Sequence, residues 1–542
     1  MRTDDQKHPY QLLSVYICGS CLFPMSVVLI NPNLIVQRND PFTTGIVYMP
    51  IGLAYVAAAL RQAGISVTVI DAYAEKPCQA RRLQKFMLLG MDETEVVARL
   101  PADVKIAFVY AINLTNHIST VGIVRTLKQA LPKLAVVILE NTQAVTAYAL
   151  QSVMSDFFEA GADFVLTGEG EHRAVRLAQM VVDGYNSQRL LSLDGLGSPQ
   201  GHSSPVEVVT DLDALPFPAW DLFPLENYWN LHFAHGPVTS GRYLPLLTSR
   251  GCPYPCKFCV IPATNHQKWR PRSAQNVVDE MEYSLHTYKV GEFHIEDPDP
   301  TISDPRIRQI CQEILRRGLE VTWKIAAGTK VETIRNEETL ELMAKAGCRY
   351  ISISPETGSP RLLKLMGKPF DLEHAVRLVN CMNRVGIHSQ ACFILGYPGE
   401  TEEDLQMTWD MVRHLTREGV DEIALFIITP VPGAEIYPQF HSAAKSLADL
   451  NSTSSAGGET TSYKSLSELT FSPAWRADYQ HLNRFRLNLY IHFLWWKLWY
   501  HPLKLLRQPI NFMRRKFDTK MEMVPYRALV LKWLDRETKV VG

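Results

Sequence analysis

Three cysteines, Cys252, Cys256 and Cys259, lie in the ten-residue run Arg-Gly-Cys-Pro-Tyr-Pro-Cys-Lys-Phe-Cys, with the spacing C-x3-C-x2-C. Three thiolates this close in sequence can hold three irons of a [4Fe–4S] cubane and leave one iron open. An open iron can bind a substrate or a second cofactor, as an open zinc position does. A zinc site is the alternative, and it needs a fourth ligand. Cys311 is 52 residues further on, whereas His266 is near enough that spacing does not exclude it.

The C-x3-C-x2-C spacing resembles the signature of the radical S-adenosylmethionine (radical SAM) enzymes. In that family the open iron chelates the methionine part of SAM, and an electron from the cluster cleaves SAM to a 5′-deoxyadenosyl radical. Phe258 precedes the third cysteine, and the resemblance implies that this aromatic ring lies near the adenine of SAM.

Further along the chain, three strings resemble SAM-binding motifs of the same family. Glu296-Asp297-Pro298-Asp299 matches the acidic motif that meets the SAM ammonium group, and the interleaved prolines leave open which of Glu296 and Asp297 makes the contact. Glu356, in Ser-Pro-Glu-Thr-Gly-Ser, is expected near the SAM amino acid or ribose. Gly396, in Gly-Tyr-Pro-Gly-Glu-Thr, lets the backbone pass close to the nucleoside. The alternatives are a solvated acidic loop for the first string and a helix N-terminal acid for Glu356.

Two series of alternating strands and helices must position these residues. Residues 25–190 contain short apolar strands between helices, which predict a parallel, doubly wound, Rossmann-like sheet. Residues 241–440 form a second series, and its six βα units match the partial (β/α)6 barrel that the resemblance implies. Barrel active sites use the loops at the C-terminal ends of the strands, and the cysteine loop follows the first strand. Residues 191–240 form a connector that we expect to pack across the domain junction.

The N-terminal series resembles a cobalamin (B12)-binding domain. Its fifth strand leads into Gly168-Glu169-Gly170-Glu171, a string that many B12-binding radical SAM proteins carry. A glycine-rich loop that opens a helix suits a large polar cofactor, although such loops also hold phosphates. Further expected cobalamin contacts are Asn33, Thr115 and Asn116. The neighbouring His117 is expected to be a surface or satisfied core histidine rather than a ligand.

Residues 25 to about 440 therefore resemble the class B, cobalamin-dependent radical SAM enzymes. The resemblance implies a C-methyltransferase that acts on an unactivated carbon of a small molecule or lipid, supplied with electrons by a low-potential donor such as flavodoxin or ferredoxin. An oxidative cyclase or ring-rearranging enzyme on a tetrapyrrole is the first alternative. A non-catalytic cobalamin-binding protein is another. A methylthiotransferase would carry three more cluster cysteines, whose spacing Cys18, Cys21 and Cys78 do not match.

The composition limits the number of domains, the binding partners and the cellular compartment that fit this interpretation. A chain of 542 residues exceeds the size of one core, which stops growing near ~250–300 residues. The net charge of −1 gives no global field that would favour nucleic acid. Of the ten cysteines, the seven outside the cluster loop are scattered, which predicts a reducing cytoplasm rather than a secreted disulfide framework.

The chain ends are predicted to differ from the two domains. Residues 1–24 are expected to be a poorly ordered extension, 441–470 a flexible linker, and 471–542 a helical C-terminal region. In this region, the fourteen aromatic-rich residues 487–500 precede a basic cluster and are too few to span a bilayer, which needs ~20. They predict a helix that caps the barrel mouth or an interfacial helix in peripheral contact with a membrane, and we favour the cap although the two are compatible.

Overall fold

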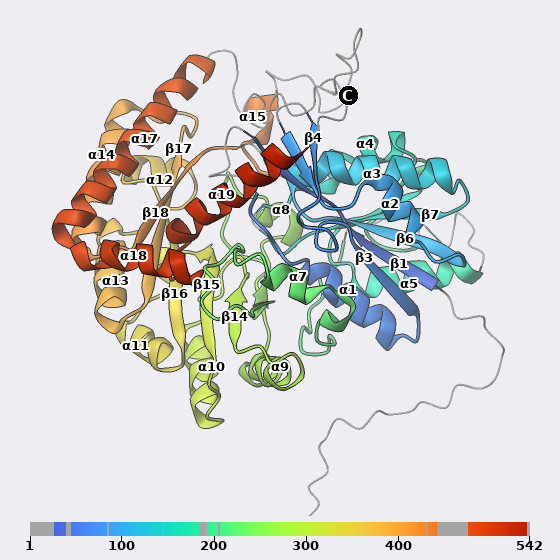
Figure 1. Ribbon diagram of the computed structural model, residues 1–542, viewed down its shortest axis with the longest axis horizontal. Helices are drawn as coiled ribbons and strands as arrows, with labels where there is room; N and C mark the ends of the chain where they lie inside the picture. Colours follow the sequence, from blue (N-terminus) through green and yellow to red (C-terminus); the bar gives the residue numbers. More distant parts are fainter. Residues whose placement is uncertain are drawn as a thin grey trace, which may run out of the picture.

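The computed structural model describes residues 26–38, 45–83, 86–144, 146–183, 190, 192–203, 206–429, 431–441 and 475–538. It contains an N-terminal sheet domain and a barrel domain side by side, with C-terminal helices that run along the barrel and across to the first domain (Figure 1). The predicted extension 1–24 and residues 442–470 of the predicted linker lie outside the described residues.

The N-terminal domain is built on a seven-stranded sheet with the order β10-β9-β8-β7-β6-β1-β3. The strands from β3 to β8 in this order run parallel, and β9 and β10 join antiparallel. All six residues of β1 are buried, as expected for a strand covered by helices on both faces. The strands are β1 (Ser26–Asn31), β3 (Ser66–Asp71), β6 (Val104–Ala111), β7 (Ala135–Glu140), β8 (Phe164–Leu166), β9 (Leu196–Ser198) and β10 (Gly201–His202).

The sheet starts in β1, adds β3 on one side and then continues through β6 on the other side. The strand order therefore reverses between β1 and β6, the place where doubly wound sheets bind ligands at the carboxyl ends of their strands. The helices are α1 (Ile51–Gln62), α2 (Glu93–Ala98), α3 (His117–Ala130), α4 (Met154–Glu159) and α5 (Glu171–Asp183). The predicted Rossmann-like fold is confirmed, but its sheet continues to His202, beyond the predicted boundary at residue 190.

A small antiparallel sheet of three strands accompanies the main sheet and was not predicted. Its order is β2-β5-β4, with β2 (Leu34–Gln37), β4 (Ala80–Leu83) and β5 (Phe86–Leu89). The connector contributes α7 (Leu225–Trp229), whose Tyr228 is fully buried and donates a hydrogen bond of 2.7 Å from its hydroxyl to Asp71. Trp229 donates from Nε1 to the carbonyl of Tyr243, at 2.8 Å, so the connector packs across the domain junction as expected.

The second domain is a parallel six-stranded sheet with the order β11-β14-β15-β16-β17-β18, which confirms the predicted partial (β/α)6 barrel. Its strands are β11 (Leu244–Leu246), β14 (Glu292–Ile295), β15 (Thr322–Thr329), β16 (Cys348–Glu356), β17 (His388–Leu395) and β18 (Glu422–Ile427). Its helices are α8 (Ile261–Asn265), α9 (Ala274–Thr287), α10 (Asp304–Arg316), α11 (Glu337–Lys345), α12 (Pro360–Leu365), α13 (Leu372–Val385), α14 (Glu402–Glu418) and α15 (Tyr437–His441). Local sequence sets the ends of these helices: Thr401 and Asp404 form a capping box at α14, which ends at the left-handed Gly419.

Three C-terminal helices complete the described chain: α17 (Trp475–Tyr500), α18 (Pro502–Arg514) and α19 (Lys520–Glu537). Helix α17 packs against α14 and β18, and α19 contacts both β18 and β4. Figure 1 shows α19 crossing from the barrel toward the N-terminal domain. The C-terminal region is therefore helical and packs on the barrel as expected, but α17 covers the edge strand β18 and the outer helix α14 rather than the barrel mouth. None of the helices in the described ranges has the length and apolar character needed to cross a membrane.

Candidate active site at the domain junction

The cysteine loop follows the first barrel strand and is held at both ends by a two-stranded ladder. Strand β12 (Ser249–Arg250) precedes the loop and pairs antiparallel with β13 (Arg270–Pro271), which follows it. Gly251 has φ +75°, and a Cβ there would lie 2.2 Å from the carbonyl oxygen of Lys268, so no other residue fits. In the middle of the loop, the amide of Lys257 donates to the carbonyl of Met366 at 3.0 Å. The loop is thus fixed to the barrel along its length.

The three cysteines are unpaired and partly exposed. Burial raises the pKa of Cys252 and of Cys259 to about 12, and the nearby negative charge of Cys256 raises both further. Thiols in this state need nearby positive charge to become thiolates, and an iron cluster supplies it. Within the described ranges, no group of three His, Cys, Asp or Glu side chains is arranged around a single metal ion. Thiolates that bind different irons of one cluster need no such common centre, so the residues fit a cluster.

Four charged side chains surround the cysteines. Burial also raises the pKa of Cys256, while the positive charges of Lys368 and Lys330 lower it. Lys368 donates from Nζ to Glu356 at 2.6 Å, and although burial alone lowers the pKa of Lys368, the Glu356 carboxylate holds it above its usual value. The Asp299 carboxylate acts electrostatically on both Cys252 and Cys256. A site with carboxylates and ammonium groups of this kind complements a zwitterion such as an amino acid.

Asp299 has one oxygen that no described residue satisfies. Its Oδ1 accepts hydrogen bonds from Thr329, at 2.6 Å, and from Thr301 and Thr333, both at 3.2 Å. Its Oδ2 is buried and without a hydrogen-bond partner among the described residues. A buried carboxylate oxygen without a protein partner is costly, so this oxygen is a candidate contact for a bound group.

Three of the predicted SAM contacts, Glu356, Phe258 and Asp297, have different surroundings. Glu356 lies at the end of β16 with φ +66°, a strained conformation for a residue with a side chain. Phe258 packs beside a buried cluster that contains Leu362 and Met366. Asp297 is fully buried and accepts hydrogen bonds from Thr248, at 2.6 and 2.7 Å, and from Ser249, at 2.6 Å. The carboxylate of Asp297 is therefore already hydrogen-bonded to the residues just before the cysteine loop.

The remaining two predicted SAM contacts are separated from each other. Glu296 faces the domain junction, where its carboxylate accepts a hydrogen bond from Nδ1 of His235 at 2.6 Å. Gly396 has φ +79°, and its amide donates to the carboxylate of Glu400. The structure thus brings Glu356 close to Cys256, whereas Glu296 opens into a pocket between the domains.

The Gly-Glu-Gly-Glu string joins the two domains through buried ion pairs. Glu169 accepts from Arg250 at 3.1 Å and from Arg270 at 2.7 and 2.9 Å, and Glu171 accepts from Arg250 at 2.7 Å. All four side chains are at least nine-tenths buried. Burial raises the pKa of Glu169, but the two arginines outweigh this and hold it below its usual range. Because Arg250 and Arg270 bracket the cysteine loop, this acidic string fixes the loop against the N-terminal sheet.

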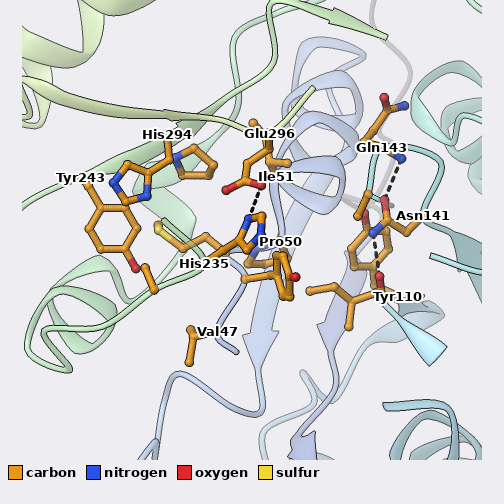
Figure 2. Close-up of a pocket in the computed structure, with 16 residues that line it drawn as sticks. Val47, Pro50, Ile51, Tyr110, Asn141, Gln143, His235, Tyr243, His294 and Glu296 are labelled. Carbon is orange, nitrogen blue, oxygen red and sulfur yellow. Dashed lines mark hydrogen bonds and ion pairs between the residues drawn. The ribbon is translucent and has the colours of Figure 1, made fainter. Parts of the chain in front are cut away.

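A pocket between the domains lies beside this junction and has ≈ 540 Å³ of free space, counting the part open to solvent. Figure 2 shows Tyr110, Asn141 and Gln143 from the N-terminal domain on one side and His235 and Glu296 on the other. Burial lowers the pKa of His235, which favours the neutral ring. Two smaller pockets continue from it along the same sheet edge. One shares Tyr110 and Gln143 with the first pocket and includes Gly170, and the other shares Tyr48 and includes Asn116.

The predicted cobalamin contacts lie at this edge at different depths. Asn116 borders a pocket, and its side-chain oxygen also accepts a hydrogen bond from the amide of Ile35 at 3.2 Å. Thr115 is half-buried and donates to Asn113 at 2.6 Å. Asn33 is fully buried, donating to the carbonyl of Met91, so it supports the loop from behind. At Gly168, a Cβ would lie 2.2 Å from the side chain of Val206.

His117 is the satisfied core histidine that the sequence predicted. It is buried, and its two ring nitrogens lie 3.0 Å from the hydroxyl of Tyr148 and 3.0 Å from the carboxylate of Asp156. It is not directed at the pocket.

The residues of the site that the sequence did not single out come from separate parts of the fold. Lys330 follows β15 and lies with its Nζ 4.1 Å from the ring centroid of Tyr254, and Lys368 follows α12. His235 belongs to the connector. Of the three, Lys330 alone had a sequence signal that could have found it, because it stands directly after a parallel strand, where barrel sites lie.

Comparisons with known proteins agree with this geometry. The model of the Radical SAM superfamily matches residues 246–412, which include the cysteine loop and strands β14 to β17. The chain contains a radical SAM domain. In the structure, this radical SAM domain is the barrel, and the N-terminal sheet is a second domain attached to it.

Relatives match well beyond the radical SAM domain. The chain is 29% identical over 448 residues to cytidylyl-2-hydroxyethylphosphonate methyltransferase of Streptomyces wedmorensis, covering 76% of this chain and 80% of the relative. It is 27% identical over 399 residues to anaerobic magnesium-protoporphyrin IX monomethyl ester cyclase of Rubrivivax gelatinosus, covering 72% and 66%. A solved structure of the radical SAM methyltransferase TsrM from Kitasatospora setae, with cobalamin and a [4Fe–4S] cluster bound, has a TM-score of 0.57 at 19% identity and covers 78% of each chain. The two-domain fold is therefore shared with TsrM.

Proposed function

We propose that this protein is a cobalamin-dependent radical SAM enzyme that methylates an unactivated carbon of a small molecule or lipid. One observation carries the proposal: the cysteine loop is fixed by Arg250 and Arg270 to the carboxyl edge of the N-terminal sheet, beside a pocket lined by both domains. Cys252 and Cys259 pack with Ala144 against one small apolar cluster, and Ala144 also lines the pocket. This geometry supports a reaction that uses one cofactor from each domain.

In this proposal Cys252, Cys256 and Cys259 hold a [4Fe–4S] cluster, and the charged side chains around them hold SAM. The unpaired Oδ2 of Asp299 suits the SAM ammonium group, and Lys330 or Lys368 suits the carboxylate. Asp299 is better placed for this contact than Asp297, whose carboxylate is occupied, or Glu296, which faces the pocket. When bound, the cluster with SAM supplies a radical that breaks strong C–H bonds, and cobalamin supplies a methyl carrier.

The chain's own residues would position these groups and keep water from them. Tyr110, Asn141 and Gln143 form the wall on the side of the N-terminal sheet and are proposed to face cobalamin, together with the predicted contacts Asn116 and Gly170. On the barrel side, the neutral His235 and its partner Glu296 supply hydrogen-bonding groups for a substrate. A flavodoxin or ferredoxin is the proposed electron donor.

The test is anaerobic reconstitution of the full chain with iron, sulfide and hydroxocobalamin, followed by incubation with SAM and a low-potential reductant. Mass spectrometry should detect both 5′-deoxyadenosine and S-adenosylhomocysteine, and cobalamin should stay bound after gel filtration. Failure to retain cobalamin would contradict the proposal, and a Cys256→Ala variant serves as the cluster-deficient control.

The second candidate is oxidative cyclisation, which the similarity to the magnesium-protoporphyrin ester cyclase favours. It uses the same cofactors but no net methyl transfer. Retained cobalamin with 5′-deoxyadenosine and without S-adenosylhomocysteine would support the cyclase and contradict the methyltransferase.

A further inference from the structure

Helices α17 and α18 present an apolar surface that nothing in the described chain covers. On α17, Leu487, Ile491, Leu494 and Leu498 recur at helical spacing and are exposed, and Trp499 is 75% exposed. On α18, the exposed apolar residues are Leu503, Leu506, Ile510 and Met513, with Leu503 at 72%. We call these nine residues, together with the exposed Trp495, the outer face. Large apolar side chains gathered at this exposure mark an interaction surface.

The opposite side of α17 already packs on the barrel. Its Trp496 packs edge-to-face on Trp409 of α14, with ring centroids 5.7 Å apart. Tyr490 accepts a hydrogen bond from the amide of Leu425 at 3.0 Å, and Lys497 is buried and donates to the carbonyl of Asp421. The outer face is therefore not needed to hold the helix on the barrel. Figure 1 shows α17 and α18 on the side of the barrel away from the N-terminal domain.

The same segment carries a strong excess of positive charge. From Tyr479 to Lys516 the sequence holds eight Lys and Arg residues and no Asp or Glu, a net charge of +8 in a chain whose total is −1. Two of the eight, Lys497 and Lys504, bond to carbonyl groups of the barrel, and Lys504 also pairs with Asp421 at 3.0 Å. Five of the others are exposed: Arg484, Arg507, Arg514, Arg515 and Lys516. These five exposed charges thus border the outer face.

We infer that the outer face docks on the surface of an anionic lipid bilayer, with α17 and α18 lying along it. Apolar and tryptophan side chains enter the interface between headgroups and acyl chains, while basic side chains at the border meet anionic headgroups. A second copy of this chain fits less well, because pairing two outer faces would bring two basic clusters together. The inference stands apart from the proposed activity, since binding to vesicles needs neither cofactor nor turnover.

The test is cosedimentation of the full-length protein with vesicles of phosphatidylcholine alone or mixed in equal parts with phosphatidylglycerol. We expect binding to the mixed vesicles that weakens with added salt. Arg514→Gln with Arg515→Gln should lower the partition coefficient about 25-fold, because each basic residue contributes roughly fivefold. Trp499→Ser with Leu503→Ser should lower it at least about tenfold, since two large apolar groups are lost from the interface.

A matched control changes one apolar and one basic residue elsewhere: Leu315→Ser on α10, where the side chain is 45% exposed, with Arg125→Gln on α3, which is also exposed. This control should bind as the unaltered protein does. If the Trp499 and Leu503 variant does not fold, the charge variant carries the test alone. The inference is overturned if the unaltered protein stays in solution with anionic vesicles. It is also overturned if the Arg514 and Arg515 variant and the Trp499 and Leu503 variant both bind as well as the control. A dimer that these variants dissociate, without vesicle binding, would instead assign the outer face to contact between copies.

Discussion

The buried ion pairs of Glu169 allow a quantitative test of how the two domains are joined. Glu169→Gln keeps the size of the side chain but removes the charge that pairs with Arg250 and Arg270. Both arginines would remain buried with less negative charge to meet them. Breaking a buried pair in this way costs about 3–5 kcal/mol. For a cooperative unit of roughly 200 residues, this corresponds to a fall of about 6–20 °C in the midpoint of thermal unfolding.

The chain provides a matched control for this substitution. Glu226 pairs with Arg242 at 3.0 Å, but the two side chains are 64% and 48% exposed. Glu226→Gln should therefore change stability by less than about 1 kcal/mol. Differential scanning calorimetry would measure both variants, and iron content after reconstitution would report on the cysteine loop. An unfolding midpoint of Glu169→Gln that matches that of Glu226→Gln would refute the reasoning.

The direction in which pH changes the contribution of Glu169 to stability follows from its pKa. The arginines hold the folded-state pKa of Glu169 below its usual value despite burial. Its contribution to stability is therefore fully present above the unfolded carboxyl pKa of about 4.3 and is lost as the pH falls through the lower folded value. The difference between the unaltered protein and Glu169→Gln should shrink in acid.

Three further predictions concern the cofactor site and a buried carboxyl group. Asp299→Asn should weaken SAM binding about tenfold or more, because a charge-assisted contact of ~1.5–3 kcal/mol is lost; isothermal titration calorimetry measures this, and an unchanged affinity would remove Asp299 from the SAM site. Cys256→Ala should abolish the iron–sulfur absorption band and lower iron content, and equal iron in the variant would contradict the cluster assignment. Burial raises the pKa of Asp71 to about 6, so its folded form favours the proton and its contribution to stability falls as the pH rises from the unfolded value near 4 to about 6. Urea unfolding across this range should show the difference between the unaltered protein and Asp71→Asn falling with pH, and a flat difference would argue against the raised pKa.

The parallel strands were predictable because burial on both faces leaves a simple trace in sequence. β1 and β7 are short apolar runs, each buried at every position. The small sheet of β2, β4 and β5 lacks this trace, since β4 reads Ala-Arg-Arg-Leu and its residues are partly or fully exposed. Its pairing partners also lie far apart in the chain, as in Leu34 opposite Leu89. Strand pairing over such separations depends on the tertiary fold rather than on local pattern.

The same distinction applies to the candidate site. The cysteines were found because all three lie in one loop with an informative spacing. The ion pairs of Glu169 join positions 81 and 101 residues apart, so sequence alone suggested a cofactor contact and not a bond between domains. The acidic run at residues 296–299 shows a third case. Only the folded backbone decides that Glu296 faces the pocket, that Asp297 bonds to the end of the first barrel strand and that Asp299 lies near the cysteines.

Helix α19 also bears on the order in which the molecule is completed. Its Lys520 donates to the carbonyl of Ala326 in the barrel at 2.7 Å, and its Asp535 pairs with Arg38 and Arg82 of the N-terminal domain at 2.7 and 3.0 Å. A ribosome releases this helix after both domains that it joins. During synthesis the sheet domain and the barrel can therefore each fold before α19 links them. The sequence order thus leaves an interval in which the side of the junction that α19 later covers is still open.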